Sequence, residues 1–371
     1  MSEKGRGEVA KKALKWVGIV LGVLALAFVG LVAWLTVREY KPAAVEDVEI
    51  NRTGAPKTVF LSPGDSLTVL SQNTGYAGLG ADSDFFMDGG KDVAPTWDQV
   101  DTNLMGLEEL LAEQKADVYF LQEVDTDSSR SNSTDESLIF WHALLSDGKG
   151  AYSSSYALNY SCDFVPYPLP PIGKVHSGLQ TLTRLHADSA QRVALPCPFS
   201  WPVSAANLKR CLLVDRVPLD GSDKELVLVN LHLEAYDDGE GKAAQTKVLM
   251  DFLTAEYEKG NYVIAGGDFN QTFPGALDAF PIQDPSLWTP GVLEEDILPD
   301  GWQFAYDLST PSCRLLNHPY DPDLLGNQFY VIDGFILSPN VRLDSVAAID
   351  CRFRYADHNP VLIQVTLEAE S

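Results

Sequence analysis

An acid and an amide stand two positions apart after an apolar run, in the stretch YVIAGGDFNQTF at residues 262–273. Residues i and i+2 of a β-strand point to the same side, so Asp268 and Asn270 can face a common point. A carboxylate and an amide placed in this way could serve a shared site. Aspartate and asparagine also favour turns, so this stretch alone is equally compatible with a turn that ends the strand.

Other apolar, strand-like runs end in polar residues in the same way. These residues are Asn73 in TVLSQN, Glu123 in YFLQEV, Asn230 and His232 in VLVNLHL, Asp333 in YVIDGF, and Asp357 and His358 in RYADHNP. A charged or amide group is costly to bury without a partner. With Asp268 and Asn270 the chain has six such places, and this repetition favours one shared site over six independent turns or caps.

The order and spacing of these motifs resemble those of the endonuclease/exonuclease/phosphatase superfamily. The resemblance covers residues 66–371 and is carried by Asn73, QEV at 122–124, NLHL at 230–233, GGDFN at 266–270, IDGFI at 332–336 and DHNP at 357–360. It implies a four-layer α/β sandwich, in which two packed mixed β-sheets are flanked by helices. It also implies hydrolysis of a phosphate ester with Mg²⁺, for which Mn²⁺ is a possible substitute.

Three residues are expected to hold the metal ion. Magnesium prefers oxygen ligands and usually keeps several waters, so one carboxylate and one amide oxygen are enough to bind it. We expect Glu123 to be the main ligand, with Asn73 beside it and Asp357 as a further ligand. Hydrolysis also requires a base that activates water, stabilisation of charge, and an acid for the leaving group.

The resemblance implies the catalytic roles of the remaining motif residues. Asp268, helped by Asn270, would orient or deprotonate the attacking water. His358, held by Asp333, would bind the phosphate or transfer a proton, since a nearby carboxylate raises the pKa of a histidine. His232 stands where the secreted nuclease and sphingomyelinase branches carry a second catalytic histidine, which the apurinic endonuclease branch lacks.

Three further residues are expected to contact the substrate, namely Asn230, His176 and Arg130. His176, in KVHSGLQTLTR, precedes the strand where relatives place a residue on the substrate side. Arg130, in DTDSSRS, carries a guanidinium whose geometry suits phosphate oxygens. A structural role for His176 and a surface salt bridge for Arg130 are equally compatible with the sequence.

Alternating strand and helix patterns must position these residues. Strands are expected at 66–74, 118–124, 177–185, 211–219, 225–233, 330–337 and 359–368, besides the run at 262–267. One helix begins at a capping box formed by Thr96 and Gln99, and a second spans residues 242–259. Adjacent strand-like runs without an intervening helix indicate antiparallel pairs, which favours a mixed sandwich over a strictly doubly wound sheet.

The first 65 residues have a different character. Residues 16–37 contain no charge, and 22 apolar positions are long enough to cross a membrane, whereas a signal peptide would have a shorter apolar region. Five basic residues precede this run, so the positive-inside rule predicts a cytoplasmic tail at 1–15 and an extracellular catalytic domain at 66–371. Residues 38–65, with three prolines and no sustained period, predict an extracellular stalk. The expected location is the cell membrane, with a single pass.

The chain is strongly acidic, with a formal net charge of −25. Residues 1–37 hold five basic and two acidic residues, a net charge of +3, which leaves −28 on the remainder. Such a surface repels polyanions, so duplex nucleic acid is disfavoured as a partner. A small phosphate ester or a lipid headgroup avoids this repulsion and is the expected substrate.

Two other functions stay open at this point. One is a cell-surface nuclease that acts on extracellular nucleic acid. The other is an inactive binding module, which is disfavoured because every motif position that can be matched is filled. The five cysteines are scattered without zinc-site spacing; they allow one or two disulfides and leave at least one thiol over. We expect a monomer.

Overall fold

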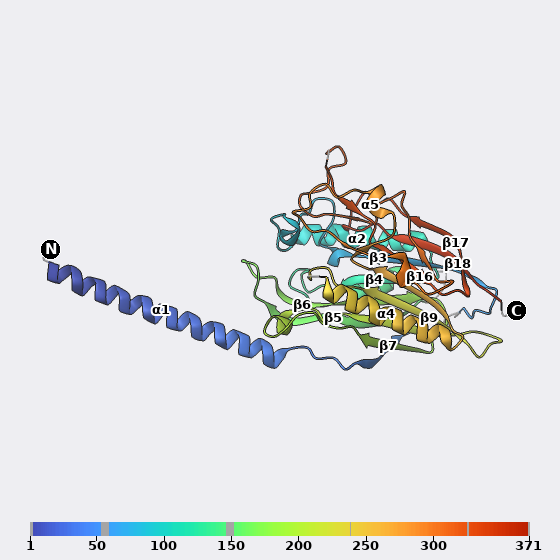
Figure 1. Cartoon of the computed structure of the whole chain (residues 1–371), viewed down its shortest axis with the longest axis horizontal. Helices are drawn as coiled ribbons and strands as arrows, with labels where there is room; N and C mark the ends of the chain where they lie inside the picture. Colours follow the sequence, from blue (N-terminus) through green and yellow to red (C-terminus); the bar gives the residue numbers. More distant parts are fainter. Residues whose placement is uncertain (1–2, 53–58, 146–151, 238, 325, 370–371) are drawn as a thin grey trace.

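The computed structural model describes residues 3–52, 59–145, 152–237, 239–324 and 326–369, with side chains from residue 11 onward. Two seven-stranded mixed sheets pack face to face and helices cover their outer faces (Figure 1). This arrangement confirms the expected four-layer α/β sandwich.

The first sheet has the strand order β1-β7-β8-β9-β10-β16-β13. Its strands span Val45–Val48, Ser189–Ala194, Cys211–Pro218, Glu225–His232, Tyr262–Asp268, Asp333–Leu337 and Gln303–Ala305, in that order. The second sheet has the order β17-β18-β3-β4-β6-β5-β2. Its strands span Val341–Ala348, Val361–Leu367, Ser66–Asn73, Val118–Asp125, Gly173–Thr183, Ser153–Val165 and Ile50–Asn51.

Each sheet contains one parallel pair of strands joined by a crossover helix. Helix α2 (Trp97–Gln114) connects β3 to β4, and helix α4 (Glu240–Glu258) connects β9 to β10. Parallel strands joined in this way end at the same edge of their sheet. The carboxyl ends of β3, β4, β9 and β10 therefore carry the motif residues to one end of the molecule.

The core explains why β3 and β4 carry apolar residues at successive positions. Val69 and Phe120 point between the two sheets, while Leu70 and Tyr119 point outward under α2 and the short helix α3 (Glu136–Leu145). A strand covered on both faces needs apolar residues at successive positions. The predicted capping box at the start of α2 is present, so this helix begins where the sequence indicates.

Short elements complete the chain between these strands. Two-stranded sheets are formed by β11 (Gln271–Thr272) with β12 (Gly291–Val292), and by β14 (Cys313–Arg314) with β15 (Phe329–Tyr330). The remaining helices are α5 (Ala276–Ala279), η1 (Gly75–Ala77), η2 (Phe86–Asp88), η3 (Val203–Ala206) and η4 (Glu295–Ile297). The five cysteines are all free thiols, so no disulfide staples the domain.

The segment expected to be a stalk is partly folded onto the domain. Strand β1 pairs with β7 in the first sheet and β2 pairs with β5 in the second. Both are short edge strands, and β1 has the sequence VEDV, which lacks the apolar alternation that predicts a strand. Residues 45–51 therefore differ from the prediction, while residues 53–58 lie outside the described part of the chain.

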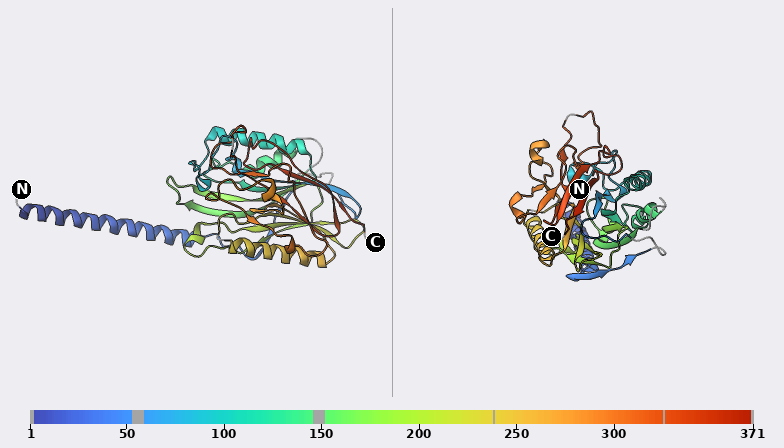
Figure 2. Two further views of the ribbon diagram at one scale, coloured as in Figure 1. Left: turned by 45° about the horizontal axis from the view of Figure 1, so that its top comes forward. Right: turned by 90° about the vertical axis from the view of Figure 1, so that its right-hand side faces the viewer.

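The N-terminal helix α1 (Glu3–Arg38) projects away from the sandwich (Figure 2). The most apolar 18 residues within Lys11–Arg38 have a mean hydropathy of 2.6, and the domain does not cover them. By length and composition this helix could cross a membrane, although a signal sequence near an N-terminus would pass the same test. The orientation of the chain relative to a membrane stays a prediction.

Candidate active site

The two sheets meet at a hydrogen bond between motif residues. Asn73, the last residue of β3, donates its side-chain N–H to Asp268 Oδ2 at 3.0 Å and to Glu123 Oε1 at 3.2 Å. Asp268 is the last residue of β10 in the opposite sheet. All three side chains lie at the same end of the sandwich, as the parallel strand pairs require.

Glu123 owes its position to an irregularity in β4. The register between β4 and β6 shifts between Leu121 and Val124, and Glu123 has a left-handed backbone with φ of +55°. Bulges of this kind re-aim a side chain and are common beside active sites. The Glu123 side chain is 25% exposed, whereas those of Asp268, His232 and His358 are almost fully covered.

Asp268 and Asn270 form a turn and also belong to the site. The strand ends at Asp268, whose Oδ1 accepts a hydrogen bond from the Asn270 backbone N–H at 2.8 Å. Asn270 has φ of +50°, and its side chain donates to the Leu233 carbonyl at 2.9 Å. The turn that the sequence allowed is therefore present, and it fixes the position of the Asp268 carboxylate; the catalytic role of the two residues stays a prediction.

His358 is held by Asp333, whose carboxylate favours the charged form of the ring. Its Nδ1 lies 2.8 Å from Asp333 Oδ2, which also accepts a hydrogen bond from the Ser312 hydroxyl at 2.8 Å. Burial disfavours the charged ring, but the carboxylates of Asp333 and Asp357 outweigh it and raise the pKa of His358 well above its usual value. Its Nε2 faces Asp268 Oδ2 at 3.8 Å.

The pKa of His232 is shifted in the opposite direction. Its Nε2 lies 3.4 Å from Asp268 Oδ2 and 4.0 Å from Glu123 Oε1. Burial, with the nearby cations Arg210 and His358, lowers the pKa of His232 well below its usual value. The acid between the two rings is also perturbed, since burial and the charge of Asp333 raise the pKa of Asp268 to about 7.

Of the three expected metal ligands, the carboxylates of Asp357 and Glu123 have the charge that a divalent cation requires. Asp357 Oδ1 is buried without a hydrogen-bond partner, and burial, the largest cause, together with the charge of Glu123 raises the pKa of Asp357 to about 7. Gly75 approaches this carboxylate so closely that a Cβ there would lie 2.9 Å from Oδ1. The Gly75 N–H in turn donates to Asn73 Oδ1 at 3.0 Å. An unpaired carboxylate oxygen beside a second acid and an amide is an arrangement that a cation would stabilise.

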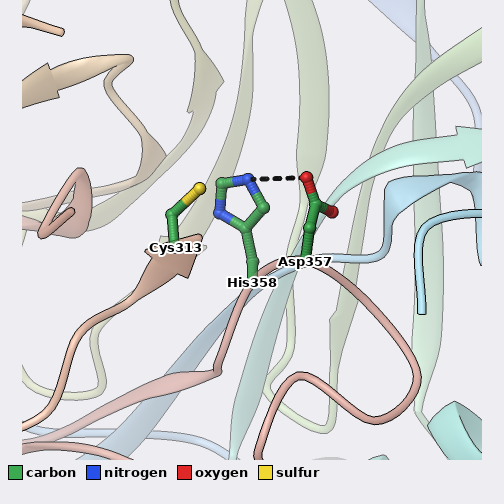
Figure 3. A group of neighbouring side chains, drawn as sticks. All are labelled: Cys313, Asp357 and His358. Carbon is green, nitrogen blue, oxygen red and sulfur yellow. Dashed lines mark ion pairs between the residues drawn. The ribbon is translucent and has the colours of Figure 1, made fainter. Parts of the chain in front are cut away.

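Two further groups of side chains that could hold a metal ion lie at the site. Cys313, Asp357 and His358 form one group, and Asp268, Asp333 and His358 form the other. Figure 3 shows the ring of His358 between the Cys313 thiol and the Asp357 carboxylate, whose Oδ2 lies 3.9 Å from Nε2. Burial raises the pKa of the Cys313 thiol to about 12, and Nδ1 of His358 is occupied by its contact with Asp333 Oδ2 at 2.8 Å.

Asn230 lies deeper than a substrate could reach. Its side chain donates to the Leu121 and Gln180 carbonyls at 3.1 and 2.9 Å, and it accepts from Gln122 Nε2 at 2.8 Å. These contacts join β9 to β4 and β6 of the opposite sheet. The predicted contact of Asn230 with substrate is not compatible with this burial, and the residue instead ties the two sheets together.

Arg130 and His176 also differ from the substrate-binding prediction. Arg130 makes two hydrogen bonds to Asp125, at 3.0 and 2.9 Å, and its guanidinium lies 3.7 Å from the centre of the Tyr76 ring. The pair is a salt bridge, as one alternative proposed, but a buried one. His176 lies half-buried on β6, where its Nε2 is 3.4 Å from Ser161 Oγ. Among the described residues no hydrogen bond or ion pair joins His176 to the motif residues.

Sequence reasoning missed several residues that support the site. Ser312 receives the Ile332 and Asp333 backbone N–H groups at 3.0 Å while donating to the Asp333 side chain. Arg210 is buried and donates to the His232 carbonyl at 3.3 Å. Tyr236 donates its hydroxyl to the buried Asp88 at 2.9 Å. Each lies far along the chain from its partner or in an irregular loop, so no spacing in the sequence could have indicated it.

Comparisons with known proteins agree with this fold. The model of the Endonuclease/Exonuclease/phosphatase family matches residues 102–349. Among solved structures, an endonuclease/exonuclease/phosphatase from Beutenbergia cavernae DSM 12333 is 17% identical with a TM-score of 0.56, over 82% of this chain and 72% of that one. One from Bacteroides vulgatus is 13% identical with a TM-score of 0.51, over 82% of this chain and all of that one.

A third solved structure, truncated Caenorhabditis elegans TDP2, is 17% identical with a TM-score of 0.50, over 82% of this chain and 99% of that one. At these identities the likenesses show the shared fold. No curated protein matches the sequence.

Proposed function

The chain belongs to the Endonuclease/Exonuclease/phosphatase family, and we propose that it is a magnesium-dependent phosphoesterase that hydrolyses phosphodiester or phosphomonoester bonds. The observation that supports this most directly is the pair of histidines around Asp268. One ring is held charged and the other neutral within 4 Å of the same carboxylate. Titratable groups whose pKa values are pushed apart in one site are typical of acid–base catalysis.

The proposed roles follow from these protonation states. Asp268, with a pKa near 7, can accept a proton from a water molecule at neutral pH. His358, charged and fixed by Asp333, can stabilise the negative charge that develops on the phosphate oxygens. His232 is neutral and lies 3.4 Å from Asp268, where it can accept a proton or a hydrogen bond. Asn73, Glu123 and Asp357 would hold the cation, whose positive charge would polarise the ester.

We further propose that α1 anchors the chain in the cell membrane with the catalytic domain outside. The uncharged run at 16–37 and the basic residues before it support this placement. The net charge of −28 beyond residue 37 supports a small phosphate ester or a lipid headgroup as the substrate over duplex nucleic acid.

The test is a panel of phosphate esters assayed with the full-length chain in detergent, with and without Mg²⁺ or Mn²⁺. The panel contains a soluble phosphodiester, a soluble phosphomonoester, a choline phosphodiester and plasmid DNA. Asp268→Asn serves as the control because it removes the proposed base while keeping the size of the side chain. We expect metal-dependent hydrolysis of at least one small ester and none above background with Asp268→Asn. Equal rates for both proteins would contradict the proposal.

The plasmid distinguishes the nuclease alternative. Repulsion between the acidic domain and DNA should weaken as salt increases, so plasmid cleavage is measured at two salt concentrations. A kcat/KM higher for the plasmid than for the choline ester at both concentrations would replace the small-ester proposal with a nuclease.

A further inference from the structure

The end of α1 is packed against the catalytic domain. Leu35 is buried, and Leu31 is half-buried, in an apolar cluster with Cys162, Val165, Val175 and Ala205. Two polar contacts flank this cluster: Trp201 Nε1 donates to Thr36 Oγ1 at 3.0 Å, and Arg38 pairs with Asp163 at 2.6 Å. The direction in which α1 leaves the domain is therefore set by side-chain packing.

This packing fixes how close the domain lies to a bilayer. Trp16 and Trp34 are exposed near the two ends of the uncharged run. At a rise of 1.5 Å per residue they lie about 27 Å apart along the helix, close to the roughly 30 Å of a bilayer's hydrocarbon core. Tryptophan favours the boundary between lipid and water. Leu31 lies about 5 Å further into the core than Trp34, so the parts of the domain that pack on Leu31 reach the boundary between headgroups and hydrocarbon.

Two loops beside the end of α1 carry exposed apolar side chains and no charge. The first comprises residues 164–173, which include the connection between β5 and β6 and the strand ends beside it, and exposes Tyr167 and Leu169 by 68% and 90%. The second comprises residues 198–208 around η3, and exposes Trp201 and Val203 by 63% and 56%. In a chain in which 21% of residues are charged, neighbouring apolar loops of this kind indicate an interaction surface.

The same end of the domain carries the candidate active site. Ser177 of β6 pairs with Asp125, two residues after Glu123, and β6 begins four residues earlier at Gly173. The loop 164–173 thus extends about 13 Å or more beyond the level of the site. The Tyr167 ring also contacts Phe86, at 5.8 Å between centroids. In Figure 1, α1 leaves the sandwich at the end opposite the C-terminus, beside β5 and β6.

We infer that residues 164–173 and 198–208 seat the catalytic domain on the bilayer that α1 crosses, with the active site opening toward the lipid headgroups. The partner is a zwitterionic lipid surface, since the domain's charge of −28 repels an anionic one. The consequence for substrate, a phosphate ester in the headgroups of that bilayer, rests on the proposed function.

The seating is tested with the full-length chain in phosphatidylcholine vesicles that contain a phosphatidylcholine with a photoactivatable diazirine in its acyl chain. Labelled peptides are mapped by mass spectrometry after illumination. We expect label in 164–173 and 198–208 as well as in α1, and none at Phe60. Phe60 is a matched control because it is 51% exposed but stacks on His186, beyond the far end of β6. Label confined to α1, or equal label at Phe60, would overturn the inference.

A pair of variants separates seating from catalysis. Leu169→Ser with Val203→Ser should reduce labelling of both loops severalfold, whereas Phe60→Ser should leave it unchanged. The double variant should hydrolyse a soluble phosphodiester at the wild-type rate and a phosphodiester in the vesicle lipid severalfold more slowly. Equal rates on the vesicle lipid for both proteins would contradict the substrate consequence. If the wild type hydrolyses neither ester, the proposed function fails, and the labelling pattern still decides the seating.

Discussion

Asn73 and Asp268 belong to different sheets, and the 3.0 Å hydrogen bond between them closes the sandwich at the site. Asn73 also bonds Glu123, so a single amide joins the proposed base to the proposed metal ligand. The end of each parallel strand pair supplies one side of this contact. The relative position of the proposed base and the proposed metal ligand therefore depends on how the two sheets pack on each other.

Glu123→Gln should keep the fold and lower activity sharply. The amide has nearly the same shape but lacks the negative charge that holds a hard cation. The Mg²⁺ concentration that gives half-maximal activity should rise as kcat/KM falls, and circular dichroism should be unchanged. Glu109→Gln, which removes an exposed charge on α2, is the control. A Glu123→Gln variant with wild-type turnover and metal requirement would show that Glu123 is not a ligand.

His232→Ala and His358→Ala should each lower kcat by about 10²–10⁴, the range for loss of acid–base or electrostatic assistance. Both rings face Asp268 Oδ2, so the double variant should lose much less than the product of the two single effects. Steady-state kinetics on one soluble ester would measure all three variants. Full kcat in either single variant would assign that histidine a structural role.

The motif residues could be predicted because each follows an apolar strand, and the strand pattern is readable in sequence. How deep a residue lies along its strand cannot be read from the sequence. Asn230 and His232 share a face of β9, yet Asn230 lies about 7 Å deeper and serves the packing of the sheets. Contacts between residues that are distant in the sequence could not be predicted either: Ser312 is 21 residues from Asp333, and Arg210 is 22 residues from His232.

Arg130→Met should destabilise the protein strongly, because it leaves the carboxylate of Asp125 buried without a counter-ion. Removing one partner of a buried pair costs about 3–5 kcal/mol, whereas Asp125→Asn combined with Arg130→Met should cost much less than the sum of the two. Thermal unfolding in one detergent would measure these differences. Lys247→Met is the control, since its pair with Asp251 is 73% and 65% exposed and should contribute less than about 1 kcal/mol.

The outcome also tests the substrate-binding alternative for Arg130. A contact with substrate would raise KM and leave the unfolding temperature unchanged. If Arg130→Met lowers stability by the same large amount whether residue 125 is aspartate or asparagine, the buried-pair interpretation is contradicted.

Asp215→Asn should make the stability of the domain less dependent on pH. Asp215 is buried between the sheets, where Ser155 Oγ donates to it at 3.0 Å, and burial raises its pKa from 3.8 to about 7. Between these two values the folded protein retains a proton that the unfolded chain has lost. The contribution of Asp215 to stability is therefore present below about pH 4 and is lost progressively as pH rises toward 7, by an amount on the order of a few kcal/mol.

The asparagine keeps an acceptor for Ser155 and has no charge to bury, so the variant should gain stability relative to wild type between pH 5 and pH 8. Thermal unfolding of both proteins at the two pH values measures this gain, with Asp251→Asn as an exposed control. A difference between wild type and Asp215→Asn that is the same at pH 5 and pH 8 would show that Asp215 does not titrate in this range.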